Sequence, residues 1–221
     1  MQAMRAQYFF ENAGMCELEN WAVSKGYRYI GGIDEAGRGA LAGPVIAACV
    51  ILDRQNIPPG IADSKSLSGT KRESLFERIC KTALCVGIGT VDPDMIDRIN
   101  ILSATKLAMK KSISSMCIRP DFLLIDAVKL LDISINSLSP VKGEKKSVSI
   151  AAASIIAKVQ RDRIMVELSS IYPYYGFSSH KGYGTALHKK HLLEYGPSKV
   201  HRYSYKPVSE VCTQWRSKNL K

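Results

Sequence analysis

Short apolar runs alternate with amphipathic segments along most of the chain, which predicts strands interleaved with helices. Apolar and β-branched residues bounded by turn residues predict strands at 27–33, 45–52, 85–91 and 122–125, with a further candidate at 131–135. Helices are predicted at 1–27, 69–83, 101–116, 147–170 and 185–195, and Asp92-Pro93 opens a short additional helix. The uninterrupted apolar run at 45–52 is typical of a strand buried on both faces. This alternation indicates one layered α/β domain.

The positive charge of the chain is concentrated in its C-terminal third. The whole sequence carries 31 basic and 20 acidic residues, whereas residues 142–221 alone carry 15 basic and 5 acidic residues, a net charge of +10. Such a surface favours a polyanionic partner, because neutralising phosphates releases condensed counterions. Solubility is the alternative explanation. Charge and element pattern together divide the chain into an N-terminal helical extension at 1–27, a core at 28–170 and a basic C-terminal helical region at 171–221.

The cysteines and the hydropathy pattern bear on the compartment. No two of the six cysteines have the CxxC spacing of a metal or redox site, and Cys49 and Cys85 lie inside apolar runs. We therefore expect reduced thiols in a cytoplasmic protein. The N-terminus is a poor signal peptide because Glu11 follows its short apolar patch, and no segment reaches the ~20 uninterrupted apolar residues that span a bilayer.

A glycine-rich turn follows the first predicted strand. Its sequence from Gly37 to Ala42, GRGALA, fits the G-x-G-x-x-A pattern of dinucleotide-binding proteins. That pattern requires a following helix, whose N-terminal amides bind the pyrophosphate. Here Gly43-Pro44 and an apolar strand follow instead, and acidic residues precede the turn. A nicotinamide or flavin site is therefore excluded.

Carboxylates stand at the ends of two predicted strands. Asp34 and Glu35 end the first strand, and Asp126 follows the apolar run at 122–125. Each acid taken singly is more commonly a turn residue, but strand ends in open α/β sheets are where sites are built. Clustered carboxylates without cysteine or histidine favour Mg²⁺ or Mn²⁺ over zinc, and two such ions can activate water and stabilise a leaving oxygen. The residues thus indicate metal-assisted hydrolysis of nucleic acid.

Five segments of the chain resemble the ribonuclease HII family, in the family's order. They are 32–45 (GIDEAGRGALAGPV), 63–67 (DSKSL), 124–127 (LIDA), 151–163 (AAASIIAKVQRDR) and 180–185 (HKGYGT), and the likeness extends over about residues 28–207. This resemblance implies a ribonuclease H-like fold, a mixed sheet flanked by helices, with a basic C-terminal helical extension. It also implies an endoribonuclease that hydrolyses the RNA strand of RNA–DNA hybrids and nicks on the 5′ side of single ribonucleotides in duplex DNA. The expected products are 3′-hydroxyl and 5′-phosphate ends, and the expected cofactors are two Mg²⁺ or Mn²⁺ ions.

The resemblance also assigns candidate acids. Family members use four, which correspond here to the expected catalytic residues and metal ligands Asp34, Glu35, Asp126 and Glu144. The fourth departs from the family, whose Lys-Gly-Asp element is Lys142-Gly143-Glu144 in this chain, and a glutamate reaches one methylene further. Asp162 is the rival for this role, although the arginines on either side of it favour a structural ion pair.

Other candidate residues concern the substrate. By resemblance, the turn residues Gly37, Arg38 and Gly39, together with Tyr183, read the ribose 2′-hydroxyl, which distinguishes RNA from DNA. Taken alone, Tyr183 would be a half-buried turn aromatic. Lys65 contacts a phosphate or is a solvated loop lysine. His180 and the pair His188 and His191 could suggest a metal site, because residues three apart share a helix face. Lys189 and Lys190 between the pair favour a helix that faces phosphate or is merely exposed.

Two other functions fit parts of the sequence. Ribonuclease HIII resembles this core but carries an added N-terminal substrate-binding domain, for which the roughly 27 residues before the first strand are too few. A basic nucleic-acid-binding module with structural acids is the second, although clustered carboxylates repel phosphates unless metals intervene. We expect a monomer that binds RNA–DNA hybrids and ribonucleotide-containing duplex DNA, with no obligate protein partner and no membrane association.

Overall fold

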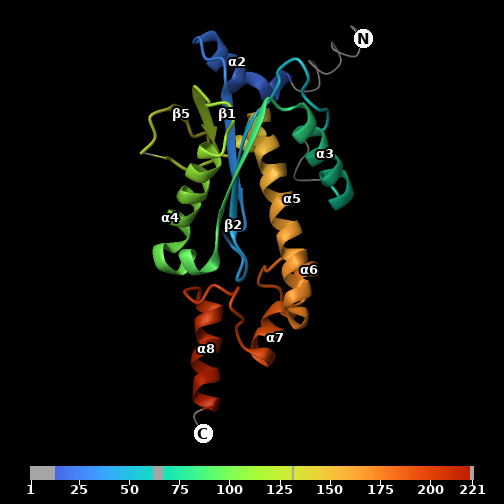
Figure 1. Ribbon diagram of the computed structural model, residues 1–221, viewed down its shortest axis with the longest axis vertical. Coiled ribbons are helices and arrows are strands. Elements are labelled where there is room, and N and C mark those ends of the chain that lie inside the picture. The colour runs from blue at the N-terminus through green and yellow to red at the C-terminus, as the bar shows by residue number, and fades with distance from the viewer. Residues whose placement is uncertain (1–12, 62–66, 131, 220–221) are drawn as a thin grey trace.

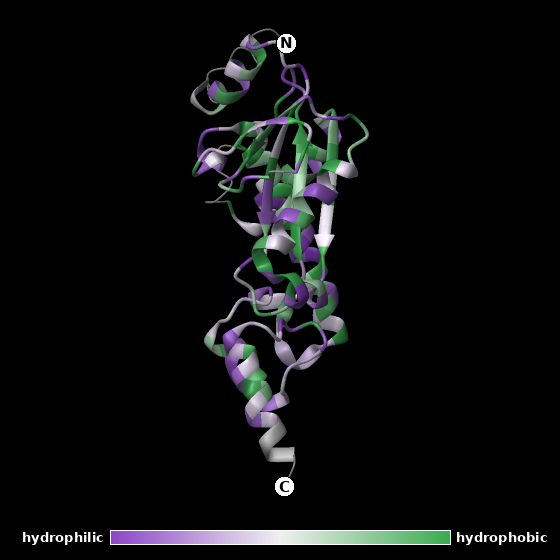
Figure 2. Ribbon diagram, turned by 90° about the vertical axis from the view of Figure 1, so that its left-hand side faces the viewer, coloured by the Kyte–Doolittle hydropathy of each residue, from purple (hydrophilic) through white to green (hydrophobic). Residues whose placement is uncertain are grey.

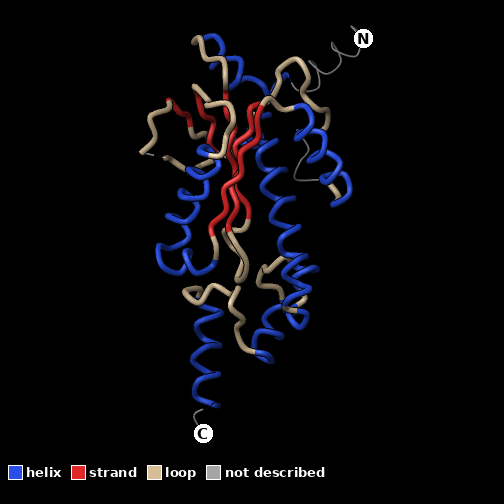
Figure 3. Tube along the Cα trace, in the orientation of Figure 1, coloured by secondary structure: helices blue, strands red, loops and turns tan. Residues whose placement is uncertain are grey.

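A five-stranded mixed sheet forms the centre of the molecule (Figure 3). The computed structural model describes residues 13–61, 67–130 and 132–219. The strands are β1 (Ile30–Ala36), β2 (Val45–Ile51), β3 (Cys85–Val91), β4 (Phe122–Ile125) and β5 (Asn136–Leu138), in the spatial order β3-β2-β1-β4-β5. β1, β2 and β3 pair antiparallel, whereas β4 and β5 add in parallel on the other side of β1. The predicted mixed sheet is confirmed.

Helices cover both faces of this sheet (Figure 1). α4 (Pro93–Ser114) packs on one face, while α5 (Val148–Ile171) packs on the other with α3 (Gly69–Thr82) beside it. The remaining helical elements are η1 (Ala13–Cys16), α2 (Glu17–Ser24), η3 (Gly143–Lys145), η4 (Pro173–Tyr175), α6 (Phe177–His180), α7 (Ala186–Tyr195) and α8 (Lys206–Asn219). Hydroxyl side chains that accept backbone amides fix where three helices begin, namely Ser68 for α3, Ser147 for α5 and Thr185 for α7.

β2 separates two apolar layers. Its Ala48 and Val50 pack with α5 and α3, whereas Ala47 and Cys49 pack with α4, because successive strand residues point to opposite faces. The predicted burial of this strand on both faces is confirmed. On the α5 side, β1 comes so close that a Cβ on Gly32 would lie 2.1 Å from the carbonyl carbon of Ser149. This contact places the start of α5 directly against β1.

The C-terminal helices pack on the glycine-rich turn that joins β1 to β2. Leu41 of this turn packs with Leu192 of α7 and with Val208 and Val211 of α8. Figure 1 shows α8 extending away from the sheet, and Figure 2 shows both apolar and polar residues along it. Leu41 therefore anchors the turn to residues distant in sequence, which fixes its position relative to the sheet.

Two details differ from the predicted elements. The candidate strand at 131–135 is wrong: Leu131 lies outside the described residues, and the paired strand, β5, begins at Asn136. Ile133 and Ile135 instead pack on the α4 layer from a loop, so their apolar character reflects burial without sheet pairing. The predicted helices at 92 and at 101–116 form one helix, α4, which is kinked at Asn100.

None of the described helices combines the length and the apolar character that crossing a bilayer demands.

Candidate active site

Two of the predicted carboxylates lie at the ends of neighbouring parallel strands. Ile33 of β1 is in register with Ile125 of β4, so Asp34 and Asp126 follow at the same level of the sheet. The amide of Asp126 donates to the carbonyl oxygen of Ile33 over 3.0 Å, which extends the pairing by one residue. Glu35 is the next residue of β1. The structure thus brings together three of the four predicted acids.

Glu144 lies in a short 3-10 turn that is bonded to the end of β4. The backbone amide of Gly143 donates to Oδ1 of Asp126 over 2.7 Å, which ties η3 to the end of β4. Glu144 is buried in this turn. Lys142 begins the turn with a left-handed backbone (φ 56°), which reverses the chain toward α5. The bond therefore brings Gly143, the residue before the fourth predicted acid, to Asp126, which is 17 positions away in the sequence.

The carboxylates raise one another's proton affinity. Burial raises the pKa of Asp34 to about 8, and the charges of Glu35 and Asp126 act in the same direction, while hydrogen bonds from the Glu35 amide and Ser154 oppose them. Burial also raises the pKa of Glu35, against the opposing effect of Arg38. The cause is common to both groups: negative charge is held away from water without enough compensating positive charge.

The donor set fits a hard divalent cation. Carboxylate oxygens are the ligands that Mg²⁺ and Mn²⁺ prefer, and Oε2 of Glu35 is buried without a hydrogen-bond partner among the described residues. The side chains are not yet in a ligating arrangement: across the described ranges, no three His, Cys, Asp or Glu side chains converge as a metal site. Oε1 of Glu35 instead accepts from Arg38 over 3.2 Å. Oε2 of Glu35 therefore remains available to an ion while Oε1 is paired with Arg38.

The predicted substrate-reading residues line one cleft with Glu35. Its volume is about 380 Å³, and it is lined by Glu35, Ala36, Gly37, Arg38, Gly39, Arg72, Ser154, Ile155, Lys158 and Tyr183. Tyr183 comes to the turn because it forms an isolated β-bridge with Ala40, next to a 2.8 Å bond from the Leu41 amide to the Gly182 carbonyl. Lys65 lies outside the described residues.

Two fully buried arginines hold the turn in place. Arg161 of α5 donates to the carbonyl oxygens of Ala42, Pro44 and Lys181 at 3.1, 3.0 and 2.9 Å. A buried turn needs such donors, because an unpaired buried carbonyl costs the free energy of a lost hydrogen bond. Gly37, at φ +97°, leaves room for this side chain, since a Cβ there would lie 2.1 Å from Nε of Arg161.

Arg202 makes the matching contacts from the C-terminal region. It donates to the carbonyl oxygens of Gly43 and Arg38, and the hydroxyl of Tyr205 also donates to Arg38 over 2.7 Å. Sequence reasoning missed the roles of both buried arginines. The one available signal was the position of Arg161 on the apolar face of a helix, four residues from Ala157 and Met165, which are both buried.

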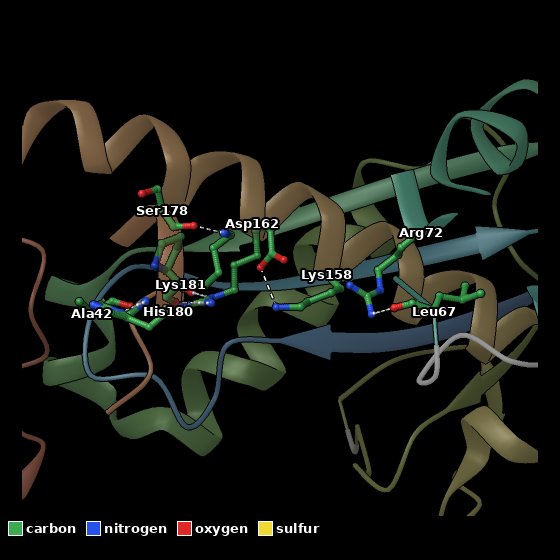
Figure 4. Close-up of polar contacts among 11 residues, drawn as sticks. Ala42, Leu67, Arg72, Lys158, Asp162, Ser178, His180 and Lys181 are labelled. Carbon is green, nitrogen blue, oxygen red and sulfur yellow. Dashed lines mark hydrogen bonds and ion pairs between the residues drawn. The ribbon is translucent and has the colours of Figure 1, made fainter. Parts of the chain in front are cut away.

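Two cations of the cleft were also missed. Figure 4 shows Lys158 on α5 and Arg72 on α3. Nζ of Lys158 contacts Oδ1 of Asp162 at 2.7 Å, and Arg72 donates to the Leu67 carbonyl over 2.9 Å. Asp162 therefore forms the expected structural ion pair, but with Lys158 of the preceding helical turn and not with the arginines beside it in sequence.

The prediction that the histidines lie on a phosphate-facing or merely exposed helix is wrong for His188. Its side chain is fully buried, with Nδ1 3.0 Å from the Tyr183 carbonyl and Nε2 3.1 Å from Nε2 of His201. His180 stacks on it with ring centroids 4.4 Å apart. The sequence suggested a surface position for His188 because the residues that follow it, Lys189 and Lys190, are charged.

The sheet is mixed, because β2 runs antiparallel to the other four strands. This sheet, with helices on both faces and acids at the ends of β1 and β4, defines a ribonuclease H-like α/β protein. The family model of ribonuclease HII matches residues 31–208, and the chain belongs to this family. A ribonuclease HII from Caldicellulosiruptor bescii is 50% identical over 195 residues, which are 88% of this chain and 95% of that protein. The protein is therefore an endoribonuclease of a family that cleaves the RNA of RNA–DNA hybrids and depends on divalent metal.

Solved structures of similar proteins share the fold. The ribonuclease H2 from Pyrococcus horikoshii OT3 superposes with a TM-score of 0.74 at 24% identity, covering 86% of this chain and 99% of that one. The ribonuclease HII of Archaeoglobus fulgidus, solved as a complex with PCNA, gives 0.71 at 26% identity over 82% and 96% of the two chains. A Bst ribonuclease HIII in complex with Mn²⁺ gives 0.69 at 18% identity over 86% and 70%.

Proposed function

We propose that this enzyme nicks duplex DNA on the 5′ side of single embedded ribonucleotides, besides cleaving longer hybrids, and leaves 3′-hydroxyl and 5′-phosphate ends. One observation carries the proposal: Glu35 and the ribose-reading candidates Gly37, Arg38, Gly39 and Tyr183 line the same cleft. An enzyme that recognises a ribose where it cuts needs its recognition elements adjacent to its acids. A single ribonucleotide then suffices as a substrate.

Asp34, Glu35, Asp126 and Glu144 are the proposed holders of two Mg²⁺ or Mn²⁺ ions. When bound, these ions would activate a water nucleophile and stabilise the leaving 3′-oxygen. The protein's own part is to hold the carboxylates in position, with Asp126 fixed by the Gly143 amide and Asp34 by the end of β1. Arg38 pairs with Glu35 and offsets part of its negative charge.

Recognition of the ribose rests on the turn and on Tyr183. Backbone groups at glycines can approach a sugar closely because no side chain intervenes. Tyr183 remains 37% exposed, and the guanidinium carbon of Arg161 lies 5.3 Å from its ring centroid. A ring held in this way can pack against a sugar while its hydroxyl bonds the 2′-hydroxyl, which is both donor and acceptor.

Binding of the nucleic acid backbone is assigned to cations around the cleft. Arg72 and Lys158 line it, and the net charge of +10 over residues 142–221 supplies a wider basic surface. Lys65 remains a proposed phosphate contact. The proposed setting is the cytoplasm, where the six cysteines, all free in this structure, would stay reduced. Because an archaeal relative was solved with PCNA, the absence of a protein partner and the monomeric state remain expectations.

The test is cleavage of a labelled DNA duplex that contains one ribonucleotide, with Mg²⁺, Mn²⁺ or EDTA, by the wild-type enzyme and by Asp34→Asn. The proposal predicts a metal-dependent nick on the 5′ side of the ribonucleotide that is lost in the variant. An all-DNA duplex is the control substrate and should stay intact. Cleavage of a long hybrid but not of the single-ribonucleotide duplex would indicate a specificity like that of ribonuclease HIII. Binding without cleavage of either would indicate a binding module.

A further inference from the structure

A hydrogen-bonded histidine pair lies directly behind the backbone of Tyr183. His188 and His201 are both fully buried, and their Nε2 atoms are 3.1 Å apart. At one end, Nδ1 of His188 contacts the Tyr183 carbonyl oxygen at 3.0 Å. At the other end, Nδ1 of His201 lies 3.0 Å from the Ser198 amide and 2.9 Å from the Ser198 hydroxyl oxygen. The four groups form one continuous chain of hydrogen bonds.

The partners at both ends determine where the protons are. A carbonyl oxygen only accepts, so Nδ1 of His188 carries the proton and its Nε2 is an acceptor. A backbone amide only donates, so Nδ1 of His201 carries no proton and Nε2–H of His201 donates to His188. Every bond of the chain therefore points toward Tyr183, from the Ser198 amide through two neutral imidazoles to the carbonyl.

Both rings must stay neutral for this arrangement to exist. A second proton on His188 would set two N–H donors against each other across the 3.1 Å contact, and a second proton on His201 would set its Nδ1–H against the Ser198 amide. Burial lowers the pKa of His188 to about 4 and that of His201 to about 3. The buried surroundings therefore favour the neutral forms that the hydrogen bonds require.

The pair joins the two segments between which the glycine-rich turn lies. On one side, the Leu41 amide donates to the Gly182 carbonyl over 2.8 Å. On the other, the Arg202 amide donates to the Leu41 carbonyl, also over 2.8 Å. His188 belongs to the helix that follows Tyr183, and His201 precedes Arg202. Their mutual bond consequently fixes the separation of the two segments, and with it the position of Tyr183 relative to the turn.

We propose that His188 and His201 are positioning residues for ribose recognition, which act by fixing Tyr183 against the Gly37–Gly39 turn. The inference rests on the proposed function, in which Tyr183 contacts the ribose. A buried histidine pair that merely filled the core would contribute to stability alone. This pair ends on the main chain of a residue that lines the cleft, so its loss changes how the substrate is held.

His188→Leu tests the inference because it removes both hydrogen bonds at similar volume. On a duplex with one ribonucleotide, KM is expected to rise about tenfold, the size of one or two orienting hydrogen bonds. The value of kcat should change little, since a contact made equally in ground and transition states affects KM. His188→Asn should recover most of the loss, because its amide can donate to the Tyr183 carbonyl from the place of Nδ1.

A double-mutant cycle separates positioning from a general structural role. In a Tyr183→Ala background, His188→Leu is expected to have no further effect on KM, because the group that it positions is already gone. The matched control is His191→Leu, on the same helix, where Nδ1 makes no hydrogen bond among the described residues. Additive losses in the cycle, or an equal rise in KM for His191→Leu, would overturn the inference.

A second measurement does not depend on the substrate. Nitrogen-15 chemical shifts of the imidazole rings at pH 7 should show neutral His188 protonated at Nδ1 and neutral His201 protonated at Nε2. The opposite tautomers, or charged rings, would refute the proposed chain of hydrogen bonds. If wild-type enzyme cuts long hybrids but not single-ribonucleotide duplexes, the proposed function fails. The double-mutant cycle is then measured with a long hybrid as substrate. Non-additive effects on KM still support the positioning role, and additive effects refute it.

Discussion

The backbone amide of Gly143 donates a hydrogen bond to Oδ1 of Asp126 over 2.7 Å. This bond joins the end of β4 to the turn that carries Glu144, so Asp126 has two separable properties. It is a hydrogen-bond acceptor that holds a neighbouring turn, and it is a negative charge in a group of acids. An asparagine keeps the first property and loses the second.

Asp126→Asn is therefore expected to abolish cleavage with little effect on the fold. The amide oxygen still accepts from Gly143, so the free energy of unfolding should change by no more than about 1 kcal/mol. Loss of a metal-binding charge should lower activity by about 100-fold or more. Mutating groups that only support metal ligands already lowers activity by up to about 100-fold. Single-turnover cleavage and urea denaturation measure the two effects.

Asp121→Asn is the matched control for this change. Asp121 precedes β4 and accepts the amides of Arg28 and Tyr29 at 2.8 and 2.9 Å, but it does not line the cleft. Its asparagine variant should cleave at the wild-type rate. Near-wild-type activity of Asp126→Asn would remove Asp126 from the metal site.

A second comparison decides which acid is the fourth of the group. Glu144→Gln is expected to lose cleavage by about 100-fold, whereas Asp162→Asn should retain it within a few-fold, because Asp162 is paired with Lys158. Glu144→Asp shortens the side chain and should alter the Mg²⁺ concentration for half-maximal activity while preserving cleavage. Cleavage by Glu144→Gln, Glu144→Asp and Asp162→Asn is measured as a function of the metal concentration. The reverse order, with Asp162→Asn inactive and Glu144→Gln active, would assign the role to Asp162.

The sequence predicted local elements well because local patterns determine them. The bounds of β3 and β4 agree with the predicted strands at 85–91 and 122–125, and the helix at 147–170 is displaced by one residue. The pairing of β4 with β1 is not local: residues about 90 positions apart share a register. The sequence pattern alone therefore could not show that Asp34 and Asp126 are adjacent. That expectation came from the family resemblance and from the rule that sites form at strand ends.

The buried polar residues could not be predicted in the same way. Arg161, Arg202 and His201 are fully buried, although arginine is usually exposed and histidine is often partly exposed. Their burial depends on carbonyl groups of a turn that a linear pattern does not place near them. The residues that hold the site together were thus less visible in the sequence than the residues that line it.

Gly37 and Gly39 should respond differently to alanine. A Cβ on Gly39 meets no atom within 4 Å, so Gly39→Ala should leave stability within about 0.5 kcal/mol of wild type. Its methyl group would occupy space next to the proposed ribose contact and raise KM on a single-ribonucleotide duplex about tenfold. Gly37→Ala should lower stability as well, because φ is +97° and the Cβ would displace Arg161. Thermal denaturation and cleavage kinetics separate the two; equal stability losses would contradict the assignment.

The buried histidines predict how stability depends on acid. The folded-state pKa values of His188 (about 4) and His201 (about 3) lie below the roughly 6.5 of an unfolded histidine. Burial is the main cause of both lowered pKa values. The charges of His180 and His191 lower the pKa of His188 further, and those of His188 and His180 lower the pKa of His201 further. The Tyr175 ring also packs on His201. Below pH ~6.5 the unfolded chain binds protons that the folded chain does not, so stability is complete above that pH and falls as the solution is acidified toward pH ~4.

His201→Gln isolates this contribution, because it removes one titrating ring and leaves a side chain that can still donate toward His188. Urea denaturation between pH 7.5 and 4.5 should show a shallower loss of stability for the variant, by about one bound proton, or roughly 1.4 kcal/mol per pH unit. Comparison of variant with wild type cancels the carboxylates, including Asp34, whose raised pKa acts in the opposite direction as pH rises. Parallel pH profiles for the two proteins would show that His201 binds its proton as readily in the folded state as in the unfolded chain, which contradicts the buried, neutral ring that the hydrogen-bond chain requires.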